Sequence, residues 1–333
     1  MTTTLPRSEG LLILPHLNVQ NANAISSPLT HGFPSMTAFL GLMWALERNL
    51  KDVAPRLFFD SIGVVCHGFD EQVTDDGYVR KFRLTRNPVD RDGSTAAIVE
   101  EGRIHLDITL VFGVTGHDDD NIVVADETQR KQLAARIGDV VAGMRIAGGS
   151  VLLPFAARGR RIRPELVPLA DANDPDARSA QSRRLRRQWL PGFALVGRDD
   201  LLQARTAKLR KADPAASALD AWLGLSRFNW HSGRDTETGK VEWSHDRAEG
   251  WIVPIPVGYG ALSDSQDPGT VRNARDPTTR FRFVESLYSI GQWIGPHRLN
   301  HPNQLLWYAH SDDSGGAFRC RNDFAPPSTT SNH

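Results

Sequence analysis

The order of apolar segments in the first 154 residues restricts the fold of this chain more than any other feature. Four short apolar runs predict strands at residues 10–17, 61–69, 105–114 and 150–154. Two windows with helical spacing cover residues 33–50 and 127–144. Pro34 and Ser35 suit the first turn of the first helix, and Gly148-Gly149 is predicted to end the second. The order β-α-β-β-α-β is that of a ferredoxin-like or RRM-type unit, in which two helices back four antiparallel strands.

Residues 70–103, between the second and third predicted strands, are too long for a simple hairpin. Turn signals occur at Asp76-Gly77, Asn87-Pro88 and Asp92-Gly93. We therefore predict an inserted β-hairpin or arm at this point of the α+β fold.

The pattern is looser after Pro154. Helices are predicted at residues 178–189, 199–210 and 219–225, and extended segments at 250–259 and, with helix as the alternative, at 281–293. Pro254 and Pro256 indicate an edge or irregular strand. Residues 228–249 are polar and turn-rich, which is typical of a mobile or variable loop, and residues 326–333 are predicted to be disordered.

Composition and short motifs exclude several classes of protein. Cys66 and Cys320 form no CxxC pair, which argues against a disulfide scaffold and a structural zinc site and favours a reducing, cytoplasmic location. The chain starts without signal-peptide features, and no window reaches the roughly 18 apolar residues of a membrane span. His117 beside the aspartates at 118–120 could hold a metal, but consecutive acids point in different directions. We expect neither a metal nor another cofactor.

Residues 18–35 are dense in amides and hydroxyls. Asn and Gln side chains carry both donors and an acceptor, so they can bind base edges, sugar hydroxyls or another backbone. The alternative is a polar loop that caps the following helix. The candidate contact residues are Gln20, Asn21, Asn23 and Ser26.

Arginines are concentrated in two short windows, although the net charge is zero, with 39 basic and 39 acidic residues. The eight arginines are Arg158, Arg160, Arg161, Arg163, Arg183, Arg184, Arg186 and Arg187. They could contact RNA, a DNA duplex or an acidic protein surface, or simply be solvated. We favour nucleic-acid backbone contacts, because such charge provides affinity without sequence specificity.

Several segments, in order along nearly the whole chain, resemble one known family. The main ones are VQNANAISSPLTHGFP at 19–34, LTRNPVDRDGSTAAIVEEGR at 84–103, VPIPVGY at 253–259 and VRNARD at 271–276. Shorter ones are MRIAGGS at 144–150, LPGFALV at 190–196, RFVE at 282–285 and PHR at 296–298. Together they resemble the second Csy subunit of type I-F CRISPR systems, a Cas-five-like family. Residues 228–249 and the C-terminal tail carry none of these segments.

This resemblance implies a non-catalytic RNA-binding subunit of a crRNA-guided DNA surveillance complex that acts in antiviral defence. The implied partners are the crRNA 5′ handle, the large first Csy subunit, the backbone Csy subunits and target double-stranded DNA within the complex. The implied fold is a modified RRM at residues 1–154, with residues 70–103 as an inserted thumb. Residues 155–325 would be a basic helical and β extension that packs on the RRM.

The residues of the matching segments suggest how RNA could be bound. The further candidates are Arg86, Asn87 and Arg91 in the thumb, Gly148 and Gly149, and Arg272, Asn273 and Arg275. Arginine and asparagine can contact phosphates and bases, and glycine allows RNA to approach the main chain. Each group has a structural alternative: turns in the thumb, a helix end at the glycines, and a solvated turn at residues 272–275.

Two other functions compete with this interpretation. Some Cas-five-like relatives process precursor RNA without a metal, and His16, His31 or His67 could provide acid–base chemistry for such an endoribonuclease. The other alternative is an assembly scaffold with incidental RNA contacts.

Overall fold

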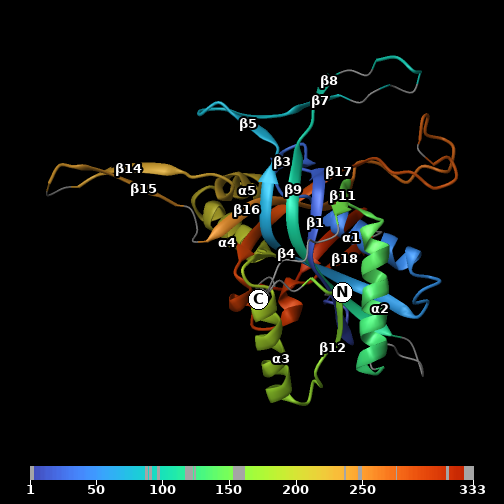
Figure 1. The fold of residues 1–333 in the computed structure, drawn as a ribbon. Helices are drawn as coiled ribbons and strands as arrows, with labels where there is room; N and C mark the ends of the chain where they lie inside the picture. Colours follow the sequence, from blue (N-terminus) through green and yellow to red (C-terminus); the bar gives the residue numbers. More distant parts are fainter. Residues whose placement is uncertain are drawn as a thin grey trace.

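A computed structural model describes residues 4–86, 89, 92–95, 98–116, 123, 125–152, 162–235, 238–246, 250–274, 276–312 and 315–325. Over these residues the chain is an α+β protein built around one large antiparallel sheet (Figure 1). The strands of this sheet are β1 (Gly10–Asn23), β4 (Leu57–Glu71), β9 (Arg103–Gly116), β10 (Arg145–Ile146), β11 (Gly149–Leu152), β12 (Glu165–Pro168), β13 (Phe193–Gly197), β16 (Trp251–Ala261), β17 (Val284–Ile294), β18 (Trp307–Asp312) and β19 (Ala317–Asn322).

Five helices accompany the sheet within the described residues. They are α1 (Met36–Asn49), α2 (Glu127–Ala142), α3 (Pro175–Gln188), α4 (Asp199–Ala212) and α5 (Ala218–Leu225), with short 3-10 helices η2 (Pro296–Arg298) and η3 (Pro302–Leu305). Small two-stranded ribbons are formed by β2 (Ile25–Ser27) with β3 (Thr30–His31), β5 (Val73–Asp75) with β6 (Arg80–Phe82), β7 (Leu84–Arg86) with β8 (Ile98–Glu100), and β14 (Trp230–Arg234) with β15 (Val241–His245).

The first half of the chain forms the strand order β11-β1-β9-β4, with helices on one face. Phe39 of α1 and Ile137 of α2 pack in one core with Leu12 of β1. Because side chains alternate along a strand, Leu11 lies on the opposite face, where it packs with Leu185 of α3. The four strands and two helices expected from the apolar pattern are therefore present.

The ends of these elements differ from the prediction. The first helix begins at Met36, because Ser35 caps it by accepting a hydrogen bond from the Thr37 N–H, so Pro34 and Ser35 precede the helix. The second helix ends at Ala142, and Gly143 is its C-cap. The prediction that Gly148-Gly149 ends this helix is wrong, because these glycines belong to the turn and first residue of the β10–β11 hairpin.

The second half of the chain continues the same sheet from β4. Phe193 of β13 pairs with Cys66, and Trp307 of β18 pairs with Ile62. The buried Trp307 indole donates a hydrogen bond from Nε1 to the Leu195 carbonyl oxygen over 2.9 Å. The sheet therefore links residues on both sides of the expected division at 154–155, which itself lies outside the described residues.

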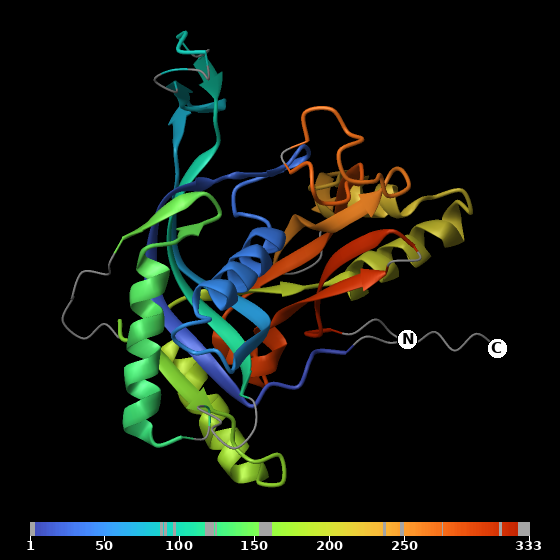
Figure 2. The same cartoon turned by 90° about the vertical axis from the view of Figure 1, so that its right-hand side faces the viewer.

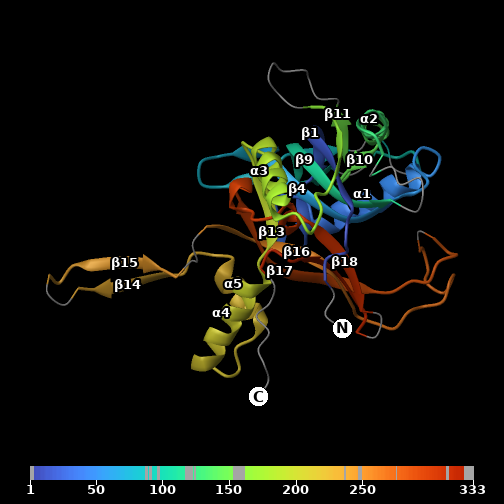
Figure 3. The same ribbon diagram turned by 90° about the horizontal axis from the view of Figure 1, so that it is seen from below.

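The second half also corrects one expectation. Residues 228–249 were expected to be a loop, but their described part forms the β14–β15 hairpin, with Trp230 opposite His245. Figure 3 shows this hairpin with α4 and α5 at the end of the molecule away from α2. Residues 281–293, expected to be extended or helical, are mainly strand β17. β16 pairs with β17 along its length, but it pairs with β19 only through Gly258–Gly260. Pro254 and Pro256 therefore lie in the part of β16 that comes before its pairing with β19.

An arm projects from the sheet between β4 and β9, where the sequence predicts an insertion. Its described parts are the β5–β6 and β7–β8 ribbons. Figures 1 and 2 show the arm at one end of β4 and β9, and α3 at the opposite end of the molecule. The arm and α3 therefore mark two separate regions of the surface.

Several absences can be stated for the part of the chain that the structure describes. No helix there is long and apolar enough to cross a membrane. No cluster of three or more His, Cys, Asp or Glu side chains there is arranged to hold a metal, and the aspartates at 118–120 lie outside the described residues. Cys66 and Cys320 are free and buried.

Candidate nucleic-acid interface

A row of exposed polar side chains crosses three neighbouring strands at the end of β1. Gln20 of β1 pairs with Ser150 of β11, which pairs in turn with Arg145 of β10. Direct cross-strand partners point to the same face of a sheet, and all three residues are exposed. Val19, the neighbour of Gln20, is buried in the core beneath α1 and α2, so the row lies on the opposite face of the sheet. This face is covered by α3 around Leu11 but is open at the end of β1 where Gln20 is exposed, and we call this exposed end the open face.

Asn21 lies beside this row at an irregularity in the pairing of β1 with β9. Its backbone is left-handed, with a φ of 56°, and its N–H donates to Nδ1 of His105 over 3.1 Å. Arg103 Nη1 donates to the Asn21 carbonyl oxygen over 3.5 Å, and its Nη2 lies 2.6 Å from Glu101 Oε2. The bulge thus brings an exposed amide next to a guanidinium group. Arg103 is not among the expected contact residues.

Asn23 and Ser26 have local structural roles. The Asn23 side chain donates to the Ile25 carbonyl oxygen over 2.8 Å and accepts from the Ile25 N–H over 3.1 Å. Ser26 Oγ lies 2.8 Å from Thr30 Oγ1. Both side chains therefore hold the turn that leads to α1. This agrees with the alternative in which the polar residues of this segment form a loop before the helix. The exposed Gln20 and Asn21 are better placed to reach a ligand.

Gly148 and Gly149 occupy different environments. Gly148 has a φ of 80°, and no heavy atom lies within 4 Å of the position where a Cβ would be. A Cβ on Gly149 would lie 2.7 Å from both the Ala22 nitrogen and the Gln20 oxygen. Gly149 therefore permits close packing of β11 on β1, whereas the space beside Gly148 is open.

Two of the histidines considered for catalysis lie on the open face and are held by neighbours. His67 Nδ1 is 2.6 Å from the Pro191 carbonyl oxygen, and its Nε2 is 2.7 Å from Thr109 Oγ1. His16 Nδ1 is 2.9 Å from Asp107 Oδ1, and the two histidine rings are 4.0 Å apart. Since both ring nitrogens of His67 already have partners, this ring is poorly placed to accept a proton from an RNA hydroxyl.

A cavity of about 470 Å³ opens between the end of β4 and strands β16 and β17. Its lining includes the exposed or partly buried rings of Phe33, Phe69, Phe193 and Trp251 and the buried ring of Trp293. In its wall the third histidine, His31, places Nδ1 3.0 Å from Glu71 Oε1. Aromatic faces of this kind can stack on unpaired bases. These rings come from distant parts of the chain, so no local sequence pattern marks the cavity.

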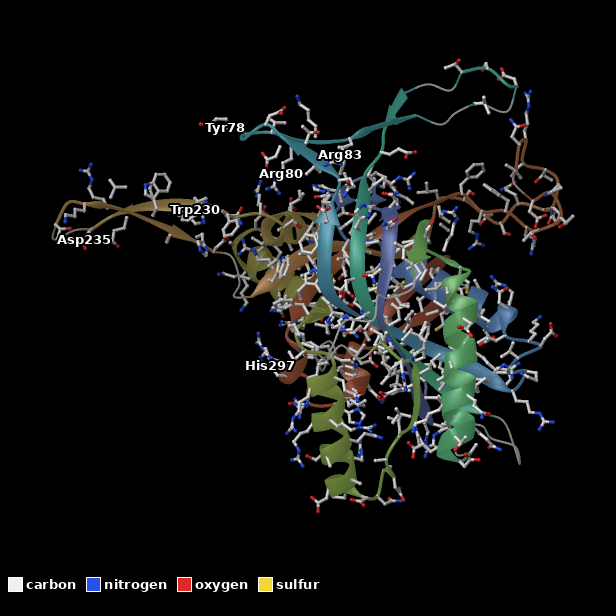
Figure 4. The ribbon with its side chains drawn as sticks, viewed as in Figure 1. Tyr78, Arg80, Arg83, Trp230, Asp235 and His297 are labelled. Carbon is white, nitrogen blue, oxygen red and sulfur yellow. The ribbon has the colours of Figure 1, made fainter. Side chains whose placement is uncertain are left out.

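The β5–β6 ribbon of the arm carries an aromatic residue at its tip and charged residues nearer the sheet. Tyr78 is fully exposed, and Figure 4 shows it at the tip of the β5–β6 ribbon, with Arg80 and Arg83 nearer the sheet. Arg80 Nε is 3.2 Å from Asp75 Oδ2, and Arg83 Nη1 donates to Gln72 Oε1 over 2.9 Å. Of the expected thumb residues, Arg86 lies in β7, whereas Asn87 and Arg91 lie outside the described residues.

The segment around Arg272 belongs to a long loop between β16 and β17. Arg272 and Asn273 are exposed in a turn, and Asn273 has a φ of 59°. Hydrogen bonds from Thr279 and Thr278 lower the pKa of Asp276 to about 2, so this carboxylate is ionised and held by local partners at neutral pH. Arg275 lies outside the described residues.

The two arginine windows separate in space. Arg158, Arg160 and Arg161 lie outside the described residues. Arg163 is exposed before β12, next to Pro164, which packs against α2. Residues 183–187 lie on α3, where Arg183, Arg184 and Arg187 are exposed and Arg186 is partly buried.

Comparison with known proteins gives two concordant matches. The family profile described as CRISPR-associated protein (Cas_Csy2) matches residues 12–320. The chain is 44% identical over 326 residues to the CRISPR-associated protein Csy2 of Pseudomonas aeruginosa (strain UCBPP-PA14), and the match covers 96% of each chain.

Proposed function

This chain belongs to the Csy2 family of CRISPR-associated proteins, and from this premise we propose that it is a non-catalytic RNA-binding subunit of a type I-F surveillance complex. In this role it binds the crRNA 5′ handle together with the large first Csy subunit. It assembles with the backbone Csy subunits and supports recognition of target double-stranded DNA.

The observation that carries the proposal is the row Gln20, Ser150 and Arg145 on the open face of the sheet. The strand order β11-β1-β9-β4 with α1 and α2 on the other face supports an RRM-type unit. RRM domains bind single-stranded RNA on the sheet face opposite their helices. An amide, a hydroxyl and a guanidinium group in one row suit bases, 2′-hydroxyls and phosphates.

Two neighbouring features support the same function. The bulge at Asn21 adds Arg103 to the row. The aromatic cavity lies between the end of β4 and strands β16 and β17. The projecting arm supports a thumb that lies over the first part of the guide, with Tyr78 at the tip of the β5–β6 ribbon. Arg272 and Asn273 are exposed and available for further contacts.

The experiment compares complexes that carry Gln20→Ala with Arg145→Gln against wild type. Loss of one phosphate contact on a single strand weakens binding about fourfold at 0.15 M salt. Loss of a hydrogen bond of about 1 kcal/mol adds about fivefold, so handle affinity should fall about 20-fold. The matched control is Gln132→Ala with Arg136→Gln, on the exposed side of α2. Equal handle affinity for test and control variants would contradict this assignment.

The scaffold alternative is tested at the other candidate segment. Arg272→Glu with Arg275→Glu should weaken handle binding and reduce its salt dependence, because positive charges near phosphates are removed. Full crRNA affinity in complexes that still assemble would favour a scaffold with incidental RNA contacts.

The nuclease alternative is tested with the purified chain and repeat RNA in the absence of metal. We expect no cleavage, because both ring nitrogens of His67 already have partners. His16 and His31, whose Nδ1 atoms lie beside Asp107 and Glu71, are the candidates that substitution tests most directly. Single-site cleavage that is abolished by substitution of His16, His31 or His67 would overturn the non-catalytic assignment.

A further inference from the structure

A positively charged surface is formed where α3 meets η2, at the end of the molecule opposite the arm (Figures 1 and 2). Its exposed members, the α3–η2 surface, are Arg183, Arg184, Arg187, His297 and Arg298. Figure 4 shows His297 beside α3. The two elements that build this surface are more than one hundred residues apart in the sequence, so only the fold joins their charges.

The arginines of this surface stand on a firmly held helix. Leu185 and Trp189 are buried against the sheet. Arg186, between the exposed arginines, donates from Nη1 to the Leu299 carbonyl oxygen over 2.6 Å and to the His297 carbonyl oxygen over 3.3 Å. Arg186 is therefore a positioning residue that ties α3 to η2, and it leaves the outward arginines as the ligand-facing groups.

Acids in the two elements that form the surface are confined to the start of α3, at its N-cap Asp174 and at Asp176. Residues 177–198 and 286–311 contain no Asp or Glu. Arg183 and Arg187 are one helical turn apart, which places their Cβ atoms about 5 to 6 Å apart. Successive phosphates of one DNA strand are about 3.4 Å apart along the helix axis, so two such arginines can meet phosphates one or two nucleotides apart.

We propose that the α3–η2 surface binds the sugar–phosphate backbone of double-stranded DNA. Guanidinium groups bind phosphates through paired hydrogen bonds, so arginine is well suited to this contact. This proposal rests on the proposed function in one respect: it assumes that the complex binds double-stranded DNA. It adds a second nucleic-acid surface, separate from the open sheet face.

The same surface is less suited to single-stranded RNA or DNA. Sites for single strands combine positive charge with exposed aromatic rings on which bases stack. Trp189 at the end of α3 is only 1% exposed, and η2 contains no Phe, Tyr or Trp. A surface of charge whose only ring is His297, with no Phe, Tyr or Trp among its members, therefore fits a duplex better, because the bases of a duplex are already stacked.

The test measures binding of the crRNA-loaded complex to a fluorescent 30-base-pair duplex without a matching target, between 0.05 and 1 M salt. The test variant is Arg183→Gln with Arg187→Gln, and the matched control is Lys208→Gln with Lys211→Gln on the exposed side of α4. Glutamine preserves helix propensity, so the variant removes charge with little effect on α3. A second variant, Arg183→Lys with Arg187→Lys, keeps the charge.

Loss of two phosphate contacts should lower the slope of log affinity against log salt by about 1.8. This corresponds to about 30-fold weaker binding at 0.15 M salt and to no change near 1 M. The control and lysine variants should keep the wild-type slope. Assembly and crRNA content are measured separately, so failure of the handle assignment is distinguishable from failure of this proposal.

Two results would overturn the proposal. An unchanged slope in the glutamine variant would show that the surface does not meet DNA. Loss of assembly in the glutamine variant, with crRNA binding by the chain intact, would show that the surface docks an acidic protein instead.

Discussion

Replacement of Gly149 by alanine tests how closely two strands must approach to build the open-face row. The added Cβ would lie 2.7 Å from the main-chain nitrogen of Ala22, from the main-chain oxygen of Gln20 and from a methyl group of Val19. Main-chain atoms of a paired strand cannot rotate away, so β11 must shift relative to β1. This shift would strain the pairing of Gln20 with Ser150.

The expected loss of stability follows from these contacts. Overpacking of a tight site costs about 1 to 3 kcal/mol, and a weakened ladder hydrogen bond costs about 1 kcal/mol. Alanine also restricts the unfolded chain, which offsets about 0.7 kcal/mol. The net destabilisation by Gly149→Ala should therefore be about 1 to 3 kcal/mol.

The measurement is urea denaturation of the purified chain, together with hydrogen exchange of the β11 amides and crRNA-handle affinity of the assembled complex. The control is Gly148→Ala, where the Cβ meets open space and only the φ of 80° is unfavourable, at about 1 kcal/mol. Handle affinity should fall for Gly149→Ala because Gln20 and Arg145 are displaced with the strands.

Wild-type stability of Gly149→Ala would refute the packing argument. A loss of handle affinity confined to Gly148→Ala would instead favour the hypothesis that RNA approaches the main chain at that glycine.

Three further predictions concern the body of the fold. Gly63→Ala should destabilise by at least about 2 kcal/mol, because its Cβ would lie 1.5 Å from a side-chain atom and 2.9 Å from a backbone oxygen of η3. Gly41→Ala, at an exposed position of α1 where the Cβ meets open space, should stabilise by about 0.5 to 1 kcal/mol. Urea midpoints that shift in opposite directions test both. Burial raises the pKa of Cys66 and of Cys320 to about 12. A thiol reagent at about pH 8 should therefore react slowly with the native chain and rapidly with the chain unfolded in urea. Rapid reaction with the native chain would show that the thiols are accessible. Trp307→Phe should cost about 2 to 4 kcal/mol in thermal or urea unfolding, since it leaves a β13 carbonyl oxygen buried without its indole donor, and an unchanged midpoint would contradict that role.

Local patterns in the sequence were sufficient to predict the main elements of the first half. Apolar spacing identified the four strands and the helices α1 and α2, because each element buries one face at its own period. The insertion between β4 and β9 was also predicted, because turn residues and excess length are local properties. Helix ends were less accurate: the role of Gly143 as a cap depends on a few hydrogen bonds that spacing does not reveal.

Longer-range pairing decided the features that sequence spacing did not identify. Residues 228–249 look like a loop because their polar side chains show no buried face, yet their described part contains the paired strands β14 and β15, whose residues are all exposed. The sequence pointed to Gln20 and Asn21 but not to Arg145 or Arg103. Those two arginines join the amides only because β10 and β11 fold back on one edge of β1 and β9 pairs with the other.

The sequence by itself determined the family, the order of the helices and strands in the first half, and the segments that carry amides and arginines. The tertiary structure decided which of these side chains share a surface. The side chains of Asn23 and Ser26 hold a local turn, Arg186 ties α3 to η2, and Arg183 and Arg187 lie on one surface with Arg298. The physical reason is that composition and periodicity act over a few residues, whereas strand register and helix packing join residues that are far apart in the chain.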